Sequence, residues 1–153
     1  MIQKIHKVFL TMRYMLCFLS LLAVVNVHAA DNDPVATRQA IFKKMLRTAY
    51  EPMGLMVRER DPYKADKFRT YATALQTLAR EPWTHFPAGS TQGKVKAEIW
   101  QNPVAFKKAQ DDFVAKVDTL ANSSKNAQQL ADVKPSYQAV AQSCKSCHND
   151  FRR

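Results

Sequence analysis

The chain has 153 residues, of which 46% are hydrophobic and 10% aromatic, and its formal net charge is +10. This length favours a single domain. The basic residues form no stripe interleaved with aromatic residues, so the charge does not indicate a nucleic-acid-binding protein.

Residues 1–29 predict a secretory signal peptide. The basic start holds Lys4, Lys7, Arg13 and no acid, and an apolar run over 16–25 and the small residues Ala29 and Ala30 follow. These are the three parts of a signal peptide, and the run is shorter than the ~20 residues that a membrane span needs. We therefore expect export to the periplasm, a mature domain over 30–153, and no membrane anchor after processing. Met12 offers an alternative start.

Processing changes both the charge and the cysteine content. Three of the 23 basic residues and no acid lie before residue 30, so the mature chain holds 20 bases against 13 acids, a net charge of +7. Such a surface can steer acidic partners. Cys17 lies in the signal, where Leu16 before it disfavours a lipoprotein site, and the mature cysteines are Cys144 and Cys147.

The mature sequence predicts helices. Only three glycines occur in the chain, and Asp33-Pro34, Asp61-Pro62 and Asn102-Pro103 each place a capping side chain before a proline. Asp and Asn accept from free N–H groups of a first helical turn, and proline fits the first helical position. These pairs predict three helix starts.

Apolar residues at spacings of three and four predict helices over 34–57, 63–80 and 103–121, and a last helix whose apolar stripe runs from Leu130 to Phe151. Pro52 should bend the first helix, and Pro135 should begin the regular part of the last. No segment has a strand pattern. The fold class is therefore all-α, an antiparallel four-helix bundle. The connection over 81–101 is rich in aromatics, which either pack on a cofactor edge or cap the bundle.

The segment Cys144-Lys145-Ser146-Cys147-His148 is the strongest chemical signal in the chain. Cys-x-x-Cys-His is the attachment sequence of c-type haem. Residues three apart share a helix face, so both thiols can add to the porphyrin vinyl groups while His148 binds iron. A redox Cys-x-x-Cys would need a helix N-terminus, and a zinc site would need a further ligand, for which only His85 remains. We predict one covalent haem c.

A second iron ligand would have to come from upstream, because only five residues follow His148. The candidates are His85, Met45, Met53 and Met56. A histidine in a connection is usually an exposed loop residue, and methionines on a helix usually fill a core.

The mature chain resembles the cytochrome c-prime family. The resemblance rests on Arg38-Gln39, on Trp83-x-x-Phe86 followed by Glu98-Ile99-Trp100, and on Phe151-Arg152 after the haem motif. It implies that Arg38 meets a haem propionate and that the protein is a homodimer. The predicted cofactor-binding residues are Cys144, Cys147, Arg38, Gln39, Phe42, Trp83, Phe86, Thr91 and Arg152.

The position four residues after Arg38 separates two groups within that family. Low-spin members have an iron-binding methionine there, whereas this chain has Phe42, which cannot bind iron. We therefore expect a five-coordinate, high-spin haem that binds NO and CO and exchanges single electrons with redox partner proteins. Phe42 as an ordinary core residue is the alternative reading. Arg152, one turn after His148, either contacts a proximal ligand or is a solvated C-terminal residue.

Two other functions remain open. A low-spin electron carrier would use Met45 as sixth ligand. A haem peroxidase would need a distal acid–base pair, for which the first helix offers only Arg38. We expect a binding and electron-transfer protein and no enzyme.

Overall fold

The computed structural model describes residues 33–153; the predicted signal peptide, residues 1–29, lies outside the described residues. In chain order the elements are α2 (Pro34–Met45), the π-helical turn η1 (Leu46–Tyr50), α3 (Glu51–Val57), α4 (Ala65–Leu78), the 3-10 turn η2 (Pro82–His85), α5 (Glu98–Gln101), α6 (Pro103–Ser124) and α7 (Leu130–Phe151).

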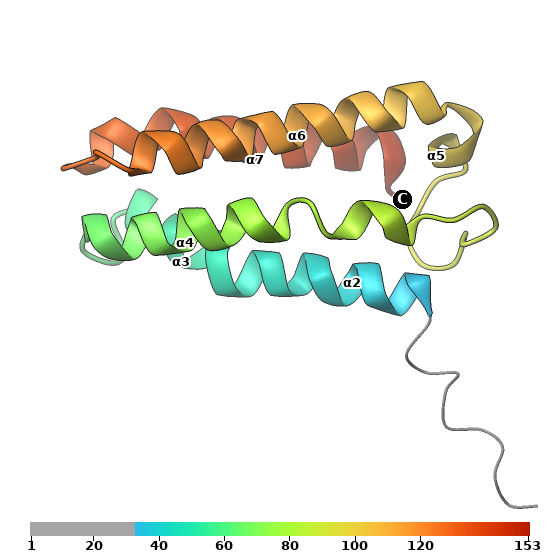
Figure 1. Ribbon diagram of the computed structural model, residues 1–153, viewed down its shortest axis with the longest axis horizontal. Coiled ribbons are helices and arrows are strands. Elements are labelled where there is room, and N and C mark those ends of the chain that lie inside the picture. Colours follow the sequence, from blue (N-terminus) through green and yellow to red (C-terminus); the bar gives the residue numbers. More distant parts are fainter. Residues whose placement is uncertain (1–32) are drawn as a thin grey trace, which may run out of the picture. The chain divides into compact units, whose positions relative to one another are not determined.

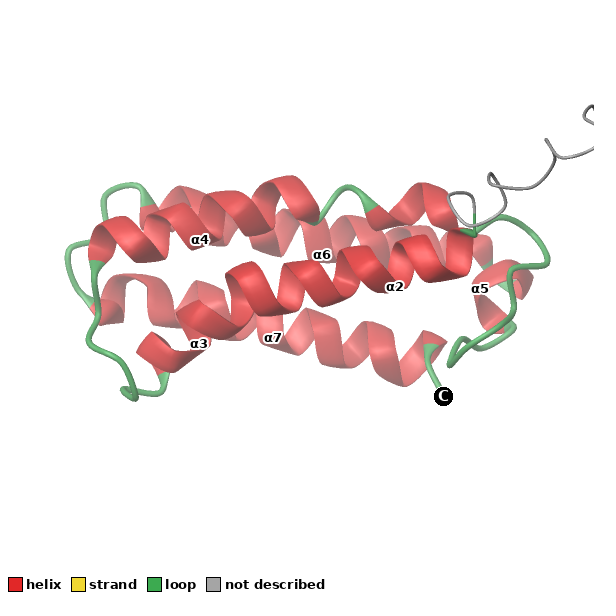
Figure 2. Ribbon diagram, turned by 90° about the horizontal axis from the view of Figure 1, so that it is seen from below, coloured by secondary structure: helices red, strands yellow, loops and turns green. Residues whose placement is uncertain are grey.

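The long helices form a four-helix bundle in which α2, η1 and α3 together make one arm. Contacts join α3 to α4, α4 to α6, α6 to α7 and α7 back to α3. Figures 1 and 2 show these arms side by side, and no strand occurs over 33–153. The all-α bundle predicted from the sequence is confirmed. No helix in this part of the chain is long and apolar enough to cross a membrane.

One end of the bundle gathers segments that are distant in sequence. The start of α2, the connection from α4 to α6, the short helix α5 and the C-terminus all lie at the right-hand end in Figure 1. The opposite end holds the turns from α3 to α4 and from α6 to α7. The haem motif near the end of α7 therefore lies at the same end as the aromatic connection.

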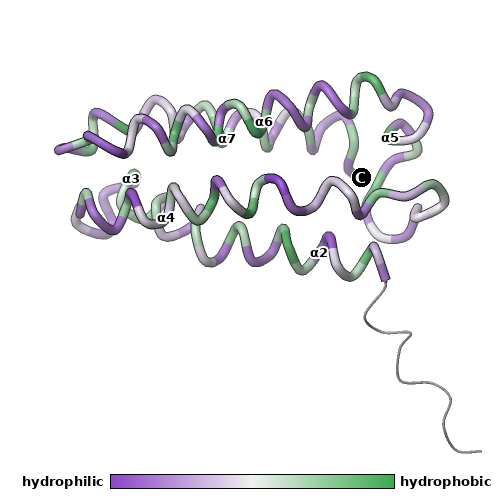
Figure 3. Tube along the Cα trace, viewed as in Figure 1, coloured by the Kyte–Doolittle hydropathy of each residue, from purple (hydrophilic) through white to green (hydrophobic). Residues whose placement is uncertain are grey.

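A core of apolar side chains runs along the bundle. Hydrophobic and hydrophilic residues alternate along each helix in Figure 3, as expected for helices with one buried side. The large apolar side chains that are fully buried are Phe68, Met53, Leu75, Leu120, Val117, Val133 and Val140. Burying an aliphatic or aromatic side chain of this size contributes about 1.5–3 kcal/mol.

Two of the three predicted helix starts are confirmed. The Oδ1 atom of Asp33 accepts from the Val35 N–H at 2.9 Å, and the Oδ1 atom of Asn102 accepts from the Ala105 N–H at 3.2 Å. Each cap satisfies a backbone donor that the first helical turn leaves free.

The third start, at Asp61-Pro62, is wrong. The helix begins at Ala65, and Lys64 at its N-cap makes no side-chain cap. The N–H groups of Arg60 and Asp61 instead donate to the Leu55 carbonyl at 2.9 and 3.2 Å. The N–H groups of these residues therefore end α3, because the last carbonyls of a helix lack donors within the helix.

The sequence predicted that Pro52 disturbs the first helix. The disturbance is present, but it lies about one turn before the proline. The chain widens into the π-helical turn over Leu46–Tyr50, and the Glu51 N–H donates to the Leu46 carbonyl. Proline removes a helical donor and crowds the preceding turn, and a widened turn directly before it relieves this crowding.

The prediction that Pro135 begins the regular part of the last helix is wrong, since α7 begins at Leu130 and contains Pro135. The reason is a cap: the Oδ2 atom of Asp132 accepts from the N–H groups of Gln128 and Gln129 at 2.9 and 3.1 Å. This capping box starts the helix before the proline, which then removes a single donor from its second turn.

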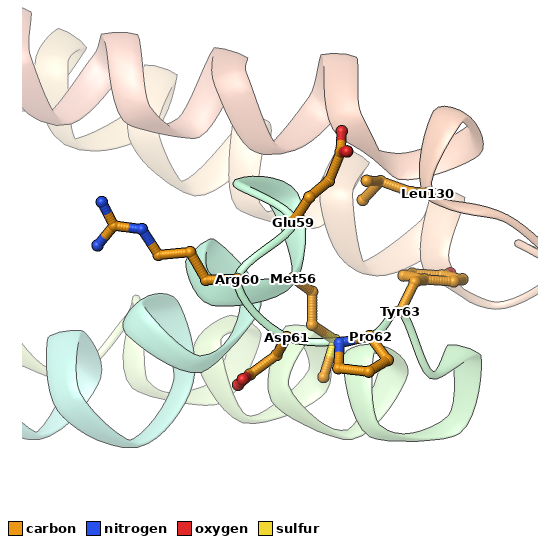
Figure 4. Close-up of a pocket in the computed structure, with 7 residues that line it drawn as sticks. All are labelled: Met56, Glu59, Arg60, Asp61, Pro62, Tyr63 and Leu130. Atoms are coloured by element: carbon orange, nitrogen blue, oxygen red, sulfur yellow. The ribbon is translucent and has the colours of Figure 1, made fainter.

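A small open pocket lies at the end of the bundle opposite the haem motif. It has a volume of about 300 Å³ and is lined by Met56, Glu59, Arg60, Asp61, Pro62, Tyr63 and Leu130. The charged side chains around it point in different directions (Figure 4). The hydroxyl of Tyr63 is buried and has no hydrogen-bond partner within residues 33–153. A buried polar group without a partner reduces stability.

We expect Tyr63→Phe to leave the stability unchanged or to raise it by up to about 1 kcal/mol, because it removes a hydroxyl that is desolvated and unpaired. Urea unfolding followed by circular dichroism measures this change. A loss above about 1 kcal/mol would mean that the hydroxyl has a partner in solution.

We expect Gly54→Ala to destabilise the protein by about 1–3 kcal/mol, because the added methyl overpacks the core. Its Cβ would lie 2.5 Å from the Tyr137 hydroxyl and 2.8 Å from Nη1 of Arg58. The double variant with Tyr137→Phe removes the nearer atom and should recover part of the loss. Equal losses in the single and double variants would contradict the clash.

Candidate functional site

The last two turns of α7 carry the predicted attachment residues. Cys144 and Cys147 are half-buried free thiols, and His148 follows on the exposed end of the helix. This confirms their expected position near a helix C-terminus, where the helix dipole disfavours a thiolate.

The pKa shifts of these groups disfavour thiol redox chemistry. Burial raises the pKa of the Cys144 thiol to about 11, and burial together with Asp150 raises the pKa of Cys147. Partial burial and the Arg152 charge lower the pKa of His148, so the imidazole is neutral near pH 7. A redox pair needs a lowered thiol pKa, whereas an iron ligand needs a neutral imidazole.

The zinc alternative finds no geometric support. Within residues 33–153, no three His, Cys, Asp or Glu side chains come close enough to hold a metal ion together. His85 is half-buried and belongs to no such group. A haem iron needs only one protein ligand, so this observation leaves the haem prediction intact.

Two hydrophobic clusters meet beside the attachment residues. The main core runs along the bundle, and a smaller group, the end cluster, consists of Ile99, Phe106 and Phe151. Trp83 packs against both clusters, Cys144 against the main core, and Cys147 against the end cluster. Each thiol therefore packs against a different one of the two clusters that Trp83 joins.

Trp83 is the centre of an aromatic group drawn from three segments. Its ring meets Phe42 of α2 edge-on at 5.8 Å between centroids, and Phe113 and Phe106 of α6 at 6.0 and 6.3 Å. Its Nε1–H donates to the Ala79 carbonyl at 2.7 Å. The structure thus unites Phe42, Trp83 and, through a centroid distance of 6.4 Å, Phe86.

Arg38 is buried, with 2% of its surface exposed. Its Nη1 donates to the His85 carbonyl at 3.0 Å and to Ser90 Oγ at 2.8 Å. Its Nη2 donates to the carbonyls of Ser90 and Gln92 at 2.7 and 3.3 Å. The guanidinium also lies 4.6 Å from the centroid of the Phe86 ring. Burial lowers its pKa, an effect that Asp33 opposes, and arginine stays charged near neutral pH.

The remaining predicted residues lie at the rim of this end. Gln39 is exposed beside Gly93, where a Cβ would come within 3.0 Å of the Gln39 Nε2 atom. Thr91 is exposed, and its N–H donates to the Gly89 carbonyl at 2.9 Å. Neither residue makes a side-chain hydrogen bond to the other predicted site residues.

The C-terminal residues are bonded to the segment before α5. Val95 and Arg152 form an antiparallel bridge, and the Lys96 N–H donates to the Phe151 carbonyl at 3.0 Å. The side chain of Arg152 is exposed, and its N–H donates to the His148 carbonyl at 3.0 Å. Sequence reasoning missed Ser90, Val95 and Lys96, because residues in a connection carry no periodic signal.

Comparison with known proteins places this site in a family. The family described as Cytochrome C′ matches residues 33–152. The chain belongs to the cytochrome c′ family.

Relatives and solved structures agree with this assignment. The chain is 33% identical over 131 residues to cytochrome c′ of Halomonas halodenitrificans, covering 81% of this chain and 98% of the relative. It is 28% identical over 125 residues to cytochrome c′ of Alcaligenes xylosoxydans xylosoxydans, covering 82% and 97%. A nitric oxide complex of a cytochrome c prime variant from Alcaligenes xylosoxidans matches with a TM-score of 0.75 at 29% identity, covering 82% and 98% of the two chains. A carbon monoxide-bound variant of the same protein matches with a TM-score of 0.74, also at 29% identity and covering 82% and 98%.

Membership of the cytochrome c′ family makes this a protein with one covalent haem c. The residues present fit that cofactor. Two protonated thiols three residues apart face a junction of apolar clusters, and a neutral imidazole follows them. A histidine nitrogen can hold a haem iron, and apolar side chains can pack against the porphyrin.

The raised thiol pKa values lead to a prediction. In a folded haem-free Cys147→Ser variant, alkylation of Cys144 should speed up about tenfold per pH unit, because only the thiolate reacts. The rise should continue to about pH 11, where burial places the pKa of this thiol.

Mass spectrometry of iodoacetamide-treated samples between pH 7 and 11 measures this rate. The matched Cys144→Ser variant reports on Cys147, whose pKa burial also raises. A rate that stops rising below pH 8 would indicate a lowered pKa and would favour the redox interpretation.

Proposed function

We propose that this cytochrome c′ holds its haem through Cys144 and Cys147, with His148 as the only protein ligand of the iron. In this proposal the iron is five-coordinate and high-spin, binds NO and CO, and exchanges single electrons with redox partner proteins. The coarser statement, a haem-binding cytochrome c′, rests on the family match.

The observation that carries the proposal is Phe42. It lies one helical turn after the buried Arg38, and its ring packs edge-on against Trp83 at 5.8 Å. A phenyl ring has no lone pair to offer a metal. With Phe42 at this position, α2 supplies an apolar side chain where low-spin relatives supply a methionine.

When bound, the haem would supply a redox-active iron that can take up a diatomic ligand. The chain's own residues decide what reaches it. The rings of Phe42, Trp83 and Phe86 exclude water from the apolar side, and the Trp83 N–H is already bonded to the Ala79 carbonyl. Dioxygen needs a hydrogen-bond donor, which this wall does not supply, while NO and CO depend on one much less.

Related structures support the same ligands. Cytochrome c prime variants of Alcaligenes xylosoxidans have been solved as a nitric oxide complex and with carbon monoxide bound, and they share 29% identity with this chain. The proposal extends this ligand class to the present chain because its wall of Phe42, Trp83 and Phe86 is apolar.

The two alternatives meet specific obstacles. Met45, the sixth ligand of the low-spin alternative, is 6% exposed and packs in the main core with Met53 and Phe68. A peroxidase needs a distal acid–base pair, and the terminal N–H groups of Arg38 are bonded to the 85–92 segment. We therefore propose no enzymatic activity.

Export to the periplasm with removal of residues 1–29 is part of the proposal and rests on the sequence of that segment. The homodimer and the proximal role of Arg152 are likewise predictions that follow from the resemblance.

The optical spectrum tests the coordination of the iron. The purified oxidised protein should show the broad bands of a high-spin haem, and the reduced protein should change its spectrum on addition of NO. Phe42→Met should convert most of the sample to sharp low-spin bands with a Met–iron charge-transfer band, because it supplies a sulfur ligand.

Met45→Leu is the matched control, and it should leave the spectrum of the oxidised protein unchanged. A low-spin spectrum in the unmodified protein that becomes high-spin in Met45→Leu would establish the low-spin alternative. Absence of covalent haem from the purified protein would refute the proposal as a whole.

A further inference from the structure

Arg38 directs its hydrogen bonds at one segment of the chain. A guanidinium has five N–H groups, of which four are on the two terminal nitrogens. Nη1 and Nη2 together make four hydrogen bonds, to the His85 carbonyl, to Ser90 Oγ and carbonyl, and to the Gln92 carbonyl. Only the Nε–H group is left for any other acceptor.

Apart from those of Arg38, the hydrogen bonds of the 85–92 segment reach few other parts of the bundle. Within 85–92 the hydrogen bonds are short-range: Ser90 N–H and Oγ donate to the Pro87 carbonyl at 3.2 and 2.8 Å. From outside the segment, Trp100 Nε1 donates to the carbonyls of Phe86 and Pro87 at 3.2 and 3.1 Å. Arg38 therefore supplies the bonds that tie Ser90 and Gln92 to the bundle.

The side chain of Arg38 also contacts an aromatic ring at the end of the bundle that carries Cys144 and Cys147, here called the haem end. The Arg38 guanidinium lies 4.6 Å from the centroid of Phe86, whose ring meets Phe106 at 5.1 Å. No described ion pair involves Arg38, so backbone carbonyls, one hydroxyl and this ring surround its buried charge. A buried cation is tolerated when hydrogen bonds replace its hydration.

We propose that Arg38 is a positioning residue that clasps the 85–92 segment over the haem end of the bundle. The inference deepens the proposed function and rests on it, because the clasped segment carries Phe86 of the apolar wall. It differs from a contact to a haem propionate alone, which would not involve the acceptors of the 85–92 segment.

Lysine tests whether the 85–92 segment needs four fixed donors or only a positive charge, because an ammonium keeps the charge but cannot bond four acceptors at fixed angles. In a clasp, Arg38→Lys should behave like Arg38→Ala. In a purely ionic contact, Arg38→Lys should behave like the unmodified protein. Lys43→Ala is the matched control, since it removes one charge from the exposed side of the same helix.

The experiment is hydrogen exchange of the haem-loaded protein, read by mass spectrometry over 85–92, together with the reduction potential. We expect both Arg38 variants to raise amide exchange there at least about tenfold, because several hydrogen bonds to a charged group are lost. Exchange in α6 and α7 should not change. The potential should fall in both variants as water reaches the haem edge, and neither readout should change in Lys43→Ala.

If amide exchange over 85–92 is as slow in Arg38→Lys as in the unmodified protein, the clasp is overturned, and a change of the reduction potential alone would indicate a propionate contact instead. If the Arg38 variants do not fold, Ser90→Ala decides the question, because it removes one of the four acceptors. It should raise exchange by about threefold to tenfold, and unchanged exchange would refute the proposal. If the purified chain lacks haem, the proposed function fails, whereas exchange over 85–92 in that protein still tests the clasp.

Discussion

The packing of Trp83 between the main core and the end cluster is the contact on which the haem end depends. Trp83 meets Phe42, Phe113 and Phe106 at centroid distances of 5.8–6.3 Å, and these rings come from α2 and α6. Aromatic pairs of this kind contribute about 0.5–1.5 kcal/mol each beyond the burial of their area. The Nε1–H bond to Ala79 removes the cost of burying a polar group in this wall. Trp83 thereby joins rings from two helices into one apolar wall.

Arg38 and Phe42 give α2 two roles at the end of the bundle that carries Cys144 and Cys147. They are four residues apart and therefore share a face of α2. Arg38 uses its charge and its donors on the 85–92 segment, and Phe42 contributes a ring to the wall. A polar support and an apolar lining thus arise from adjacent turns of a regular element, which positions side chains more rigidly than a loop does.

Local capping rules predicted a helix start correctly where the capping side chain bonds to the first turn of the helix that follows it. Asp33 and Asn102 begin α2 and α6 as expected, because each accepts from an N–H group two or three residues along. Asp61-Pro62 is the same dipeptide as Asp33-Pro34 but does not start a helix. The N–H groups of residues 60 and 61 instead donate to the Leu55 carbonyl and end α3. At Pro135 a competing cap, Asp132, decided the start of α7. Each error has the same cause: two local preferences competed for one segment, and the sequence does not rank them.

The sequence by itself predicted the attachment residues of the haem, because Cys144, Cys147 and His148 lie within about one and a half helical turns and share a face of that one helix. The periodicity of the sequence also predicted the all-α class. The sequence further shows that position 42 holds a phenylalanine and no methionine. The tertiary structure alone decided which atoms Arg38 binds and which rings surround Trp83. Those partners lie 47 to 54 residues from Arg38 in the chain, and no local spacing rule reaches across such a separation. The connection over 81–101 takes its shape from contacts with α2, α6 and the C-terminal residues, so it could be understood only once the bundle was assembled.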